Sequence, residues 1–290
     1  MGSVLFYIVD VFAEERYSGN QLAVFRHAHR LQPAIMQRLA KEMNFSETTF
    51  IMAEEGEAFP VRIFTPATEV PFAGHPTLGT AFVIQQEVIR RQVPRLFLDL
   101  AVGRIQVRFE YGPQGVEQVW MRQTEPTFGP VLERGCVAGA LGLAPEELGP
   151  VQPQVVSTGL PFIIVPVVSR EALAKAGPTF SQECSEGLPV KAFLLFCQEP
   201  RSCANHLSVR VFAHEYGVPE DPATGSANGC LGAYLVHHRY FGQNKVDLRV
   251  EQGYEIGRPS LLLVRASQLA DTIQVEVGGR VLMVAKGELV

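Results

Sequence analysis

Three side chains in this sequence have the chemistry to move a proton: Glu47, His75 and Asp221. Glu47 lies in an apolar, strand-like stretch, where burial would raise its pKa toward neutrality, as suits a general acid or base. His75 belongs to the residue type that titrates near neutral pH, and it can transfer protons or hold a substrate. Each residue also has a purely structural interpretation: an exposed strand-end glutamate, a histidine that caps a helix, and an aspartate N-cap followed by proline.

Small and hydroxyl-bearing residues surround His75 and follow Asp221, and both motifs are expected to start a helix. These residues are Gly74, Thr77, Gly79 and Thr80 in the first motif, and Thr224, Gly225 and Ser226 in the second. The free N–H groups and positive dipole end of a helix start receive anions, and glycine allows close approach to the backbone. Two such starts facing each other would hold a small acid and stabilise charge that develops beside its carboxylate.

The two motifs are part of a longer internal sequence repeat. Val61–Phe64 precedes the first motif and Val209–Phe212 precedes the second, and these strand-like starts are 148 residues apart (209 − 61). The two X-Pro steps at His75 and Asp221 are 146 residues apart (221 − 75), close to half of the 290 residues. Such a period predicts two related halves, with His75 and Asp221 at corresponding places.

The predicted elements follow the same order in both halves: strand, glycine turn, strand, helix, two strands, motif helix and a group of strands. In the first half we expect strands at 6–12, 21–25, 47–52, 61–65, 96–100, 104–111 and 116–122, and helices from 33 and from 74 to about 86. In the second half we expect strands at 153–157, 162–168, 191–197 and 207–213, helices at 170–176 and 221–238, and a closing hairpin that turns at Gly278-Gly279.

Strands in adjacent runs favour largely antiparallel sheets and the α+β class. We predict an N-terminal half over 1–125 and a C-terminal half over 126–290, with the crossing near 126–130. The last strand could return to the first half.

Composition excludes several classes of protein. A net charge of −5 and a pI near 5.8, without a Lys/Arg cluster, argue against nucleic acid as a partner. The apolar stretch 160–168 is far shorter than the ~20 residues of a membrane span. The N-terminus shows neither the basic n-region nor the cleavage site of a signal peptide, and the odd number of cysteines leads us to expect a reduced, cytoplasmic protein. Its five cysteines form no CxxC: Cys136, Cys184, Cys197, Cys203 and Cys230. No histidine has partners at metal-ligand spacing, so we expect no metal.

Five motifs in order resemble the phenazine-biosynthesis PhzF-like family of isomerases across nearly the whole chain. They are Asp10-Val11-Phe12, Ser18-Gly19-Asn20, Asn44-Phe45-Ser46-Glu47-Thr48, the run from Phe64-Thr65-Pro66 to Ala73-Gly74-His75-Pro76-Thr77, and Asp221-Pro222-Ala223-Thr224-Gly225-Ser226-Ala227. The resemblance implies the fold of diaminopimelate epimerase, with two pseudo-symmetric halves. Each half is a barrel-like, mostly antiparallel sheet around a central helix, and the site lies in the cleft between them. It also implies chemistry without cofactor or metal, and a homodimer.

The resemblance also implies roles for single residues. Glu47 would move a proton between carbons of a small unsaturated carboxylic acid. His75 and Asp221 would assist proton handling or hold the substrate. Ser46, Gly74, Gly225 and Ser226 match positions that line the substrate site.

Two other functions stay open at this point. The chain could be a small-acid binding or interaction protein that keeps the fold without turnover. It could also be a two-base epimerase, with Asp221 as the second base opposite Glu47. Racemisation by two thiols is disfavoured, because neither motif contains a cysteine and Cys230 falls inside the second helix.

Overall fold

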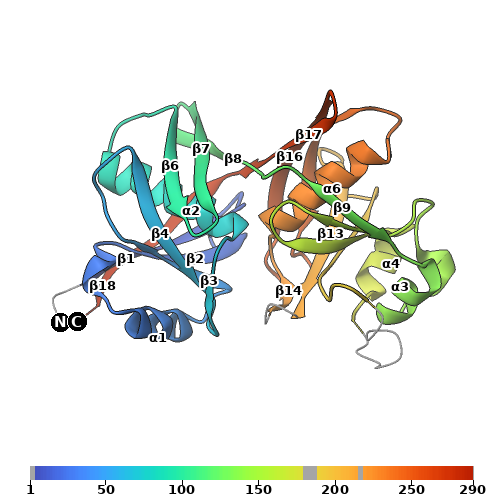
Figure 1. Ribbon diagram of the computed structural model, residues 1–290, viewed down its shortest axis with the longest axis horizontal. Coiled ribbons are helices and arrows are strands. Elements are labelled where there is room, and N and C mark those ends of the chain that lie inside the picture. Colours follow the sequence, from blue (N-terminus) through green and yellow to red (C-terminus); the bar gives the residue numbers. More distant parts are fainter. Residues whose placement is uncertain (1–3, 179–187, 215–217, 290) are drawn as a thin grey trace. The chain divides into compact units, whose positions relative to one another are not determined.

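The computed structural model describes residues 4–178, 188–214 and 218–289 and divides the chain into two compact units (Figure 1). Unit 1 consists of Met1–Arg122 together with Gly278–Val290, and unit 2 consists of Gln123–Val277. The last thirteen residues therefore belong to the same unit as the N-terminus. Cys184 lies outside the described residues.

Unit 1 is a set of strands with one helix at its centre. The strands are β1 (Val4–Val11), β2 (Asn20–Phe25), β3 (Glu47–Ile51), β4 (Ala58–Phe64), β5 (Glu69–Val70), β6 (Arg95–Leu100), β7 (Gly103–Gly112), β8 (Gly115–Arg122) and β18 (Val281–Leu289). The helices are α1 (Pro33–Met43) and α2 (Gly74–Val83), which continues into the π-helical segment η2 (Ile84–Ile89), and a short 3-10 turn is η1 (Ala28–Arg30).

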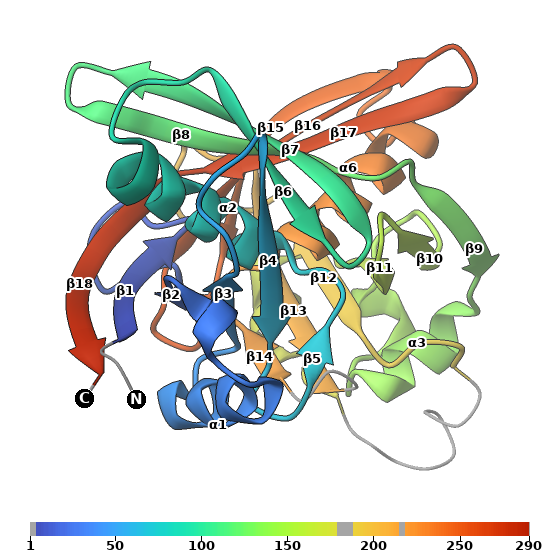
Figure 2. The same cartoon turned by 60° about the vertical axis from the view of Figure 1, so that its left-hand side comes forward.

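The strands of unit 1 pair in a mixed but mainly antiparallel order. β1 pairs antiparallel with β18 and β2, β2 runs parallel to β3, and β3 is antiparallel to β4. β4 pairs antiparallel with the short β5 and parallel with β6, and β6, β7 and β8 follow as an antiparallel meander. All ten residues of α2 are buried, and this helix contacts β1, β2, β3, β6, β7, β8 and β18 (Figure 2). An apolar helix enclosed in this way is typical of a core helix.

Unit 2 repeats this pattern. Its strands are β9 (Thr127–Val131), β10 (Gln154–Ser157), β11 (Pro161–Pro166), β12 (Phe193–Cys197), β13 (Leu207–Ala213), β14 (Val218–Asp221), β15 (Lys245–Gln252), β16 (Ser260–Leu269) and β17 (Thr272–Gly279), whose last two residues belong to unit 1. Its helices are α3 (Arg134–Ala140), α4 (Arg170–Lys175) and α6 (Gly225–His237), and its 3-10 turn is η3 (Pro145–Glu147).

The pairing in unit 2 follows that in unit 1 strand for strand. β10 and β11 are antiparallel, β11 and β12 parallel, and β12 and β13 antiparallel. β13 then pairs antiparallel with the short β14 and parallel with β15, which is antiparallel to β16. The central helix is α6, which is buried from its first residue to Val236 and contacts β10, β11, β12, β15 and β16. The mixed α+β class and the strand-enclosed helix in each unit agree with the sequence prediction.

The pairing register corrects one sequence prediction, the correspondence between His75 and Asp221. Ile63 pairs with Val70, and its counterpart Val211 pairs with Asp221, so Asp221 corresponds to Val70. The helices begin at Gly74 and Gly225, which are 151 residues apart (225 − 74). At this spacing Glu69-Val70-Pro71 aligns with Glu220-Asp221-Pro222, and His75 aligns with Ser226. The second half has three extra residues between strand and helix, which shifts the X-Pro steps out of correspondence.

Two further predictions are wrong. Asp221 is the last residue of β14 and does not start a helix, since the N-cap of α6 is Thr224. Gly278 and Gly279 lie inside β17 and do not form a hairpin turn. A Cβ atom on Gly278 would lie 2.4 Å from the indole ring of Trp120, so this glycine makes room for a buried side chain.

Candidate active site

Glu47 and His75 come together in unit 1. Glu47 is the first residue of β3 and His75 the second residue of α2. The imidazole Nε2 lies 3.4 Å from the carboxylate Oε2, and the side chains are 4% and 17% exposed, respectively. This distance is longer than that of a well-formed hydrogen bond, as is common for catalytic groups before a substrate is bound. A carboxylate and an imidazole therefore face each other at the start of a buried helix.

Asn20 completes this cluster from the start of β2. Its side chain is buried, and its Nδ2 lies 3.2 Å from Nδ1 of His75. The contact holds the buried imidazole ring against the start of β2. Burial lowers the pKa of His75 to about 3, against a smaller opposing effect of a backbone hydrogen bond with Gln21. His75 is therefore neutral at neutral pH, and its Nε2 atom faces the Glu47 carboxylate.

Strand register and close packing position these groups. In the parallel pair of β2 and β3, Leu22 lies opposite Glu47, which brings the beginnings of both strands to one end of the sheet. A Cβ atom on Gly79 would lie 2.6 Å from Leu22 Cδ2 and 2.9 Å from Val11 Cγ2. Only glycine lets α2 approach β1 and β2 this closely. A hydrogen bond of 2.8 Å between Thr49 and Thr80 ties α2 to β3.

Asp221 belongs to a polar cluster in unit 2. Its Oδ2 accepts a hydrogen bond of 2.6 Å from the hydroxyl of Thr224. The buried side chain of Gln252, at the end of β15, donates to the Asp221 carbonyl at 2.8 Å and to Thr224 Oγ1 at 3.0 Å. Gln252 Oε1 accepts from Thr224 N at 3.2 Å and from Asn228 Nδ2 at 2.9 Å. Gln252 thus joins the end of β14 to the start of α6.

The remaining predicted site residues lie at the ends of the same elements. Ser46 is half-buried and directly precedes β3, and Gly74 is the buried first residue of α2. Gly225 and Ser226 are the buried first two residues of α6. Each unit thus places glycine at the first turn of its central helix, where free backbone N–H groups are available to an anion.

The buried thiol in α6 has no acid–base role at neutral pH. Cys230 Sγ lies 3.6 Å from Thr158 Oγ1, and burial raises its pKa to about 11. A thiol whose pKa is raised in this way is a poor base at neutral pH. Within the described ranges, no three His, Cys, Asp or Glu side chains are grouped to hold a metal ion. No helix in those ranges is both long and apolar enough to cross a membrane.

Sequence reasoning missed two members of these clusters. Asn20 belongs to the Ser-Gly-Asn motif, but only the folded structure shows that this first residue of β2 contacts His75. Gln252 carries no motif signal, because it is 31 residues from Asp221 and reaches it only through the pairing of β13 with β15.

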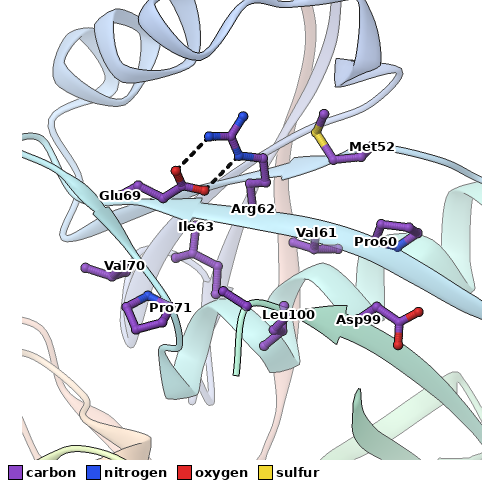
Figure 3. A pocket seen from close by; sticks show the side chains of 11 residues that line it. Met52, Pro60, Val61, Arg62, Ile63, Glu69, Val70, Pro71, Asp99 and Leu100 are labelled. Carbon is purple, nitrogen blue, oxygen red and sulfur yellow. Dashed lines mark hydrogen bonds and ion pairs between the residues drawn. The ribbon is translucent and has the colours of Figure 1, made fainter. Parts of the chain in front are cut away.

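A surface groove of about 250 Å³ in unit 1 lies beside β4 and β5 (Figure 3). Arg62 and Glu69 form a bidentate ion pair at its edge, and Val70 and Leu100 are among its apolar lining residues. Neither Glu47 nor His75 lines it. Its residues Val70 and Pro71 correspond to Asp221 and Pro222 of unit 2.

Comparisons with known proteins agree with this architecture. A family model described as phenazine biosynthesis-like protein matches residues 9–287. A trans-2,3-dihydro-3-hydroxyanthranilate isomerase from Pseudomonas aeruginosa is 36% identical over 288 residues, which cover 97% of this chain and 98% of that protein. A crystal structure of a PhzF-family protein from Bacillus anthracis aligns over 100% of both chains with a TM-score of 0.90 and 26% identity.

A hydroxyproline epimerase from Agrobacterium vitis shares the fold at 13% identity, with a TM-score of 0.67 over 99% of this chain and 92% of that chain. The epimerase-like fold predicted from the sequence is therefore confirmed. The chain belongs to the phenazine biosynthesis-like (PhzF-like) family and is an isomerase.

Proposed function

We propose that this isomerase moves a proton within a small unsaturated carboxylic acid without a cofactor, and that Glu47 is its general acid and base. The observation that carries the proposal is the contact of 3.4 Å between the Glu47 carboxylate and Nε2 of His75. Because His75 is neutral, it places no positive charge beside the proposed base.

The proposed reaction has two proton transfers. Glu47 takes a proton from one carbon of the substrate, and the C–H electron pair enters the conjugated system as an enolate-like or dienolate-like charge. The same carboxyl group then returns the proton to another carbon, and the double bond shifts. The His75 imidazole, 3.4 Å from the Glu47 carboxylate, would keep the carboxyl group in place between these steps. Backbone N–H groups at the start of α2 stabilise the developing negative charge.

The remaining candidate residues are assigned to substrate binding. Gly74, Gly225 and Ser226 would present backbone N–H groups to the carboxylate, because each lies in the first turn of a helix. Ser46 and Asp221 would bind polar groups of the acid. The named relative from Pseudomonas acts on trans-2,3-dihydro-3-hydroxyanthranilate, so this compound is the first substrate to test.

Deuterium uptake in D₂O tests the proposal. The wild type and Glu47→Gln are incubated with a panel of small unsaturated and amino acids that includes this compound, and label is read by mass spectrometry. Loss of a general acid or base costs about 10²–10⁴ in rate, so exchange should nearly vanish in Glu47→Gln. Glu42→Gln, at an exposed position of α1, is the matched control and should exchange like the wild type. Equal exchange in wild type and Glu47→Gln would move the base to another residue.

We also propose that the protein acts as a homodimer, which the resemblance to the family supports. Sedimentation equilibrium of the purified protein tests this, and a mass of one chain at micromolar concentration would contradict it.

A further inference from the structure

The hydrogen bonds that lead from Asn228 through Gln252 and Thr224 to Asp221 run in one direction. Asn228 Nδ2 donates to Gln252 Oε1, and Gln252 Nε2 donates to Thr224 Oγ1. Because an amide nitrogen only donates, Thr224 Oγ1 must accept from Gln252, and its single proton points to Asp221 Oδ2 at 2.6 Å. The chain of donors therefore ends on the carboxylate, which it favours in the ionised form.

Unit 1 shows that the fold does not need this chain. Val70 corresponds to Asp221 and Ala73, the N-cap of α2, to Thr224. Pro60 pairs with Asp99 as its counterpart Ser208 pairs with Glu251, so the next residues, Leu100 and Gln252, also correspond. Three positions of the polar chain in unit 2 are thus apolar in unit 1, although strands and helix are arranged alike. Because unit 1 forms the same arrangement without this polar chain, we infer that the chain in unit 2 has a role other than stabilising the fold.

We propose that Thr224 and Gln252 are positioning residues that orient the Asp221 carboxylate and keep it ionised for the reaction. The inference deepens the proposed function, because it assigns to Asp221 the role of a fixed hydrogen-bond acceptor that receives a donor group of the substrate. Gln252 acts through Thr224 and through the Asp221 carbonyl, which it holds at 2.8 Å.

Several charged groups on the described parts of the neighbouring elements have partners of their own. Arg210 on β13 pairs with Glu220 on β14 through two hydrogen bonds of 2.9 and 2.8 Å. Glu251 on β15 accepts from the backbone of Arg201 and Ser202 and from Asn205. On α6, Cys230 is held beside Thr158. Removal of the Thr224 hydroxyl is therefore expected to leave these three groups with their partners.

The test is a titration of the Asp221 carboxyl carbon by ¹³C NMR in the unliganded protein. Thr224→Val removes the hydroxyl and keeps the branched shape, and Thr224→Ser restores the donor. Thr224→Val should raise the pKa of Asp221 by about one pH unit, the size expected for one hydrogen bond to a carboxylate, while Thr224→Ser should leave it at the wild-type value. Gln252→Leu, which installs the residue found in unit 1, should shift the pKa in the same direction as Thr224→Val.

Ser169→Ala, at the N-cap of α4, controls for a general loss of stability and should not move the titration. An Asp221 titration identical in wild type and Thr224→Val would overturn the inference. The acidic limb of kcat/KM should move upward in Thr224→Val together with the carboxyl titration. Turnover that is unchanged in Asp221→Asn, alongside a shifted titration in Thr224→Val, would refute the role of Asp221 in the proposed reaction and leave the positioning contacts standing.

Discussion

The two units share the arrangement of strands that leads into the central helix, but they differ in the polar residues near the start of that helix. In both, a short strand follows an arginine-bearing strand, a glutamate of the short strand pairs with that arginine, and a glycine opens the central helix. Unit 1 then places a histidine at the second helical position, against Glu47. Unit 2 places serine there and puts its acidic group five residues earlier, at Asp221. Packing residues were kept in both copies, whereas the polar residues at the helix starts diverged.

This comparison distinguishes residues that are expected to stabilise the fold from residues that are expected to take part in the reaction. Residues that both copies keep, such as Arg62 and Arg210, are expected to affect stability when they are replaced. Residues in only one copy, such as His75 and Asp221, are expected to affect turnover. Three of the following four predictions compare the two units on this basis.

The largest effect is expected for the two carboxylates. Glu47→Gln should lower the rate of exchange by about 10²–10⁴, because it removes the proposed acid and base. Asp221→Asn keeps the size of the side chain and should cost less, since Asp221 is assigned to holding the substrate. Single-turnover deuterium exchange ranks the two variants. A larger loss in Asp221→Asn than in Glu47→Gln would reverse the assignment.

The next effect compares the two arginines. Arg210 also donates to the carbonyls of Leu173, Ala174 and Ala176 at the end of α4, and its side chain is 10% exposed. Arg210→Met should lower the free energy of unfolding by about 3–5 kcal/mol, because it leaves Glu220 buried without its partner. Arg62→Met removes a more exposed pair and should cost about 1 kcal/mol or less. Urea unfolding of both variants gives the difference, and equal costs would contradict this account.

A smaller effect is expected in the pH dependence of stability. The unfolded chain takes up a proton on His75 near pH 6.5, but burial keeps the folded pKa at about 3. The stabilising contribution of neutral His75 is therefore present above pH 6.5 and is lost as the pH falls toward 3. His75→Gln should flatten this fall by about 2–4 kcal/mol, whereas His29→Gln, at an exposed position, should follow the wild type. Parallel curves for wild type and His75→Gln would show that His75 is not held neutral.

The smallest effect compares the caps of α1 and α4, which follow the corresponding strands β2 and β11. Ser169 accepts a hydrogen bond of 3.1 Å from Ala172 N at the start of α4, whereas Gln32 makes no side-chain cap bond at α1. Ser169→Ala should cost about 1 kcal/mol and Gln32→Ala close to nothing. Thermal unfolding of the two variants measures the difference.

The positions of the helices and strands could be predicted from the sequence more accurately than the residue-by-residue alignment of the two halves. Hydrophobic periodicity located β3, β4, β13 and α2 within a few residues, because local pattern determines them. The sequence repeat, by contrast, aligns His75 with Asp221, because each residue precedes a proline. In the structure Pro76 lies inside α2, whereas Pro222 follows the end of β14. Only the pairing of Val211 with Asp221 shows that this residue ends a strand.

Other features depend on contacts that no local pattern contains. Two adjacent glycines predict a turn at Gly278, because both tolerate a positive φ, but in the structure Gly278 makes room for the ring of Trp120. Asn20 and Gln252 reach their partners across 55 and 31 residues of sequence. The homodimer and the cytoplasmic location remain predictions.

The pairing of β18 with β1 has a consequence for the order in which the protein forms during synthesis. Unit 2 is continuous in the chain, so all of its strands have emerged from the ribosome when Val277 appears. Unit 1 emerges first, yet β1 lacks one of its two neighbours until Val281–Leu289 is made. The half that carries Glu47 and His75 is therefore the last to close, and a nascent chain should acquire proteolytic resistance in unit 2 before unit 1.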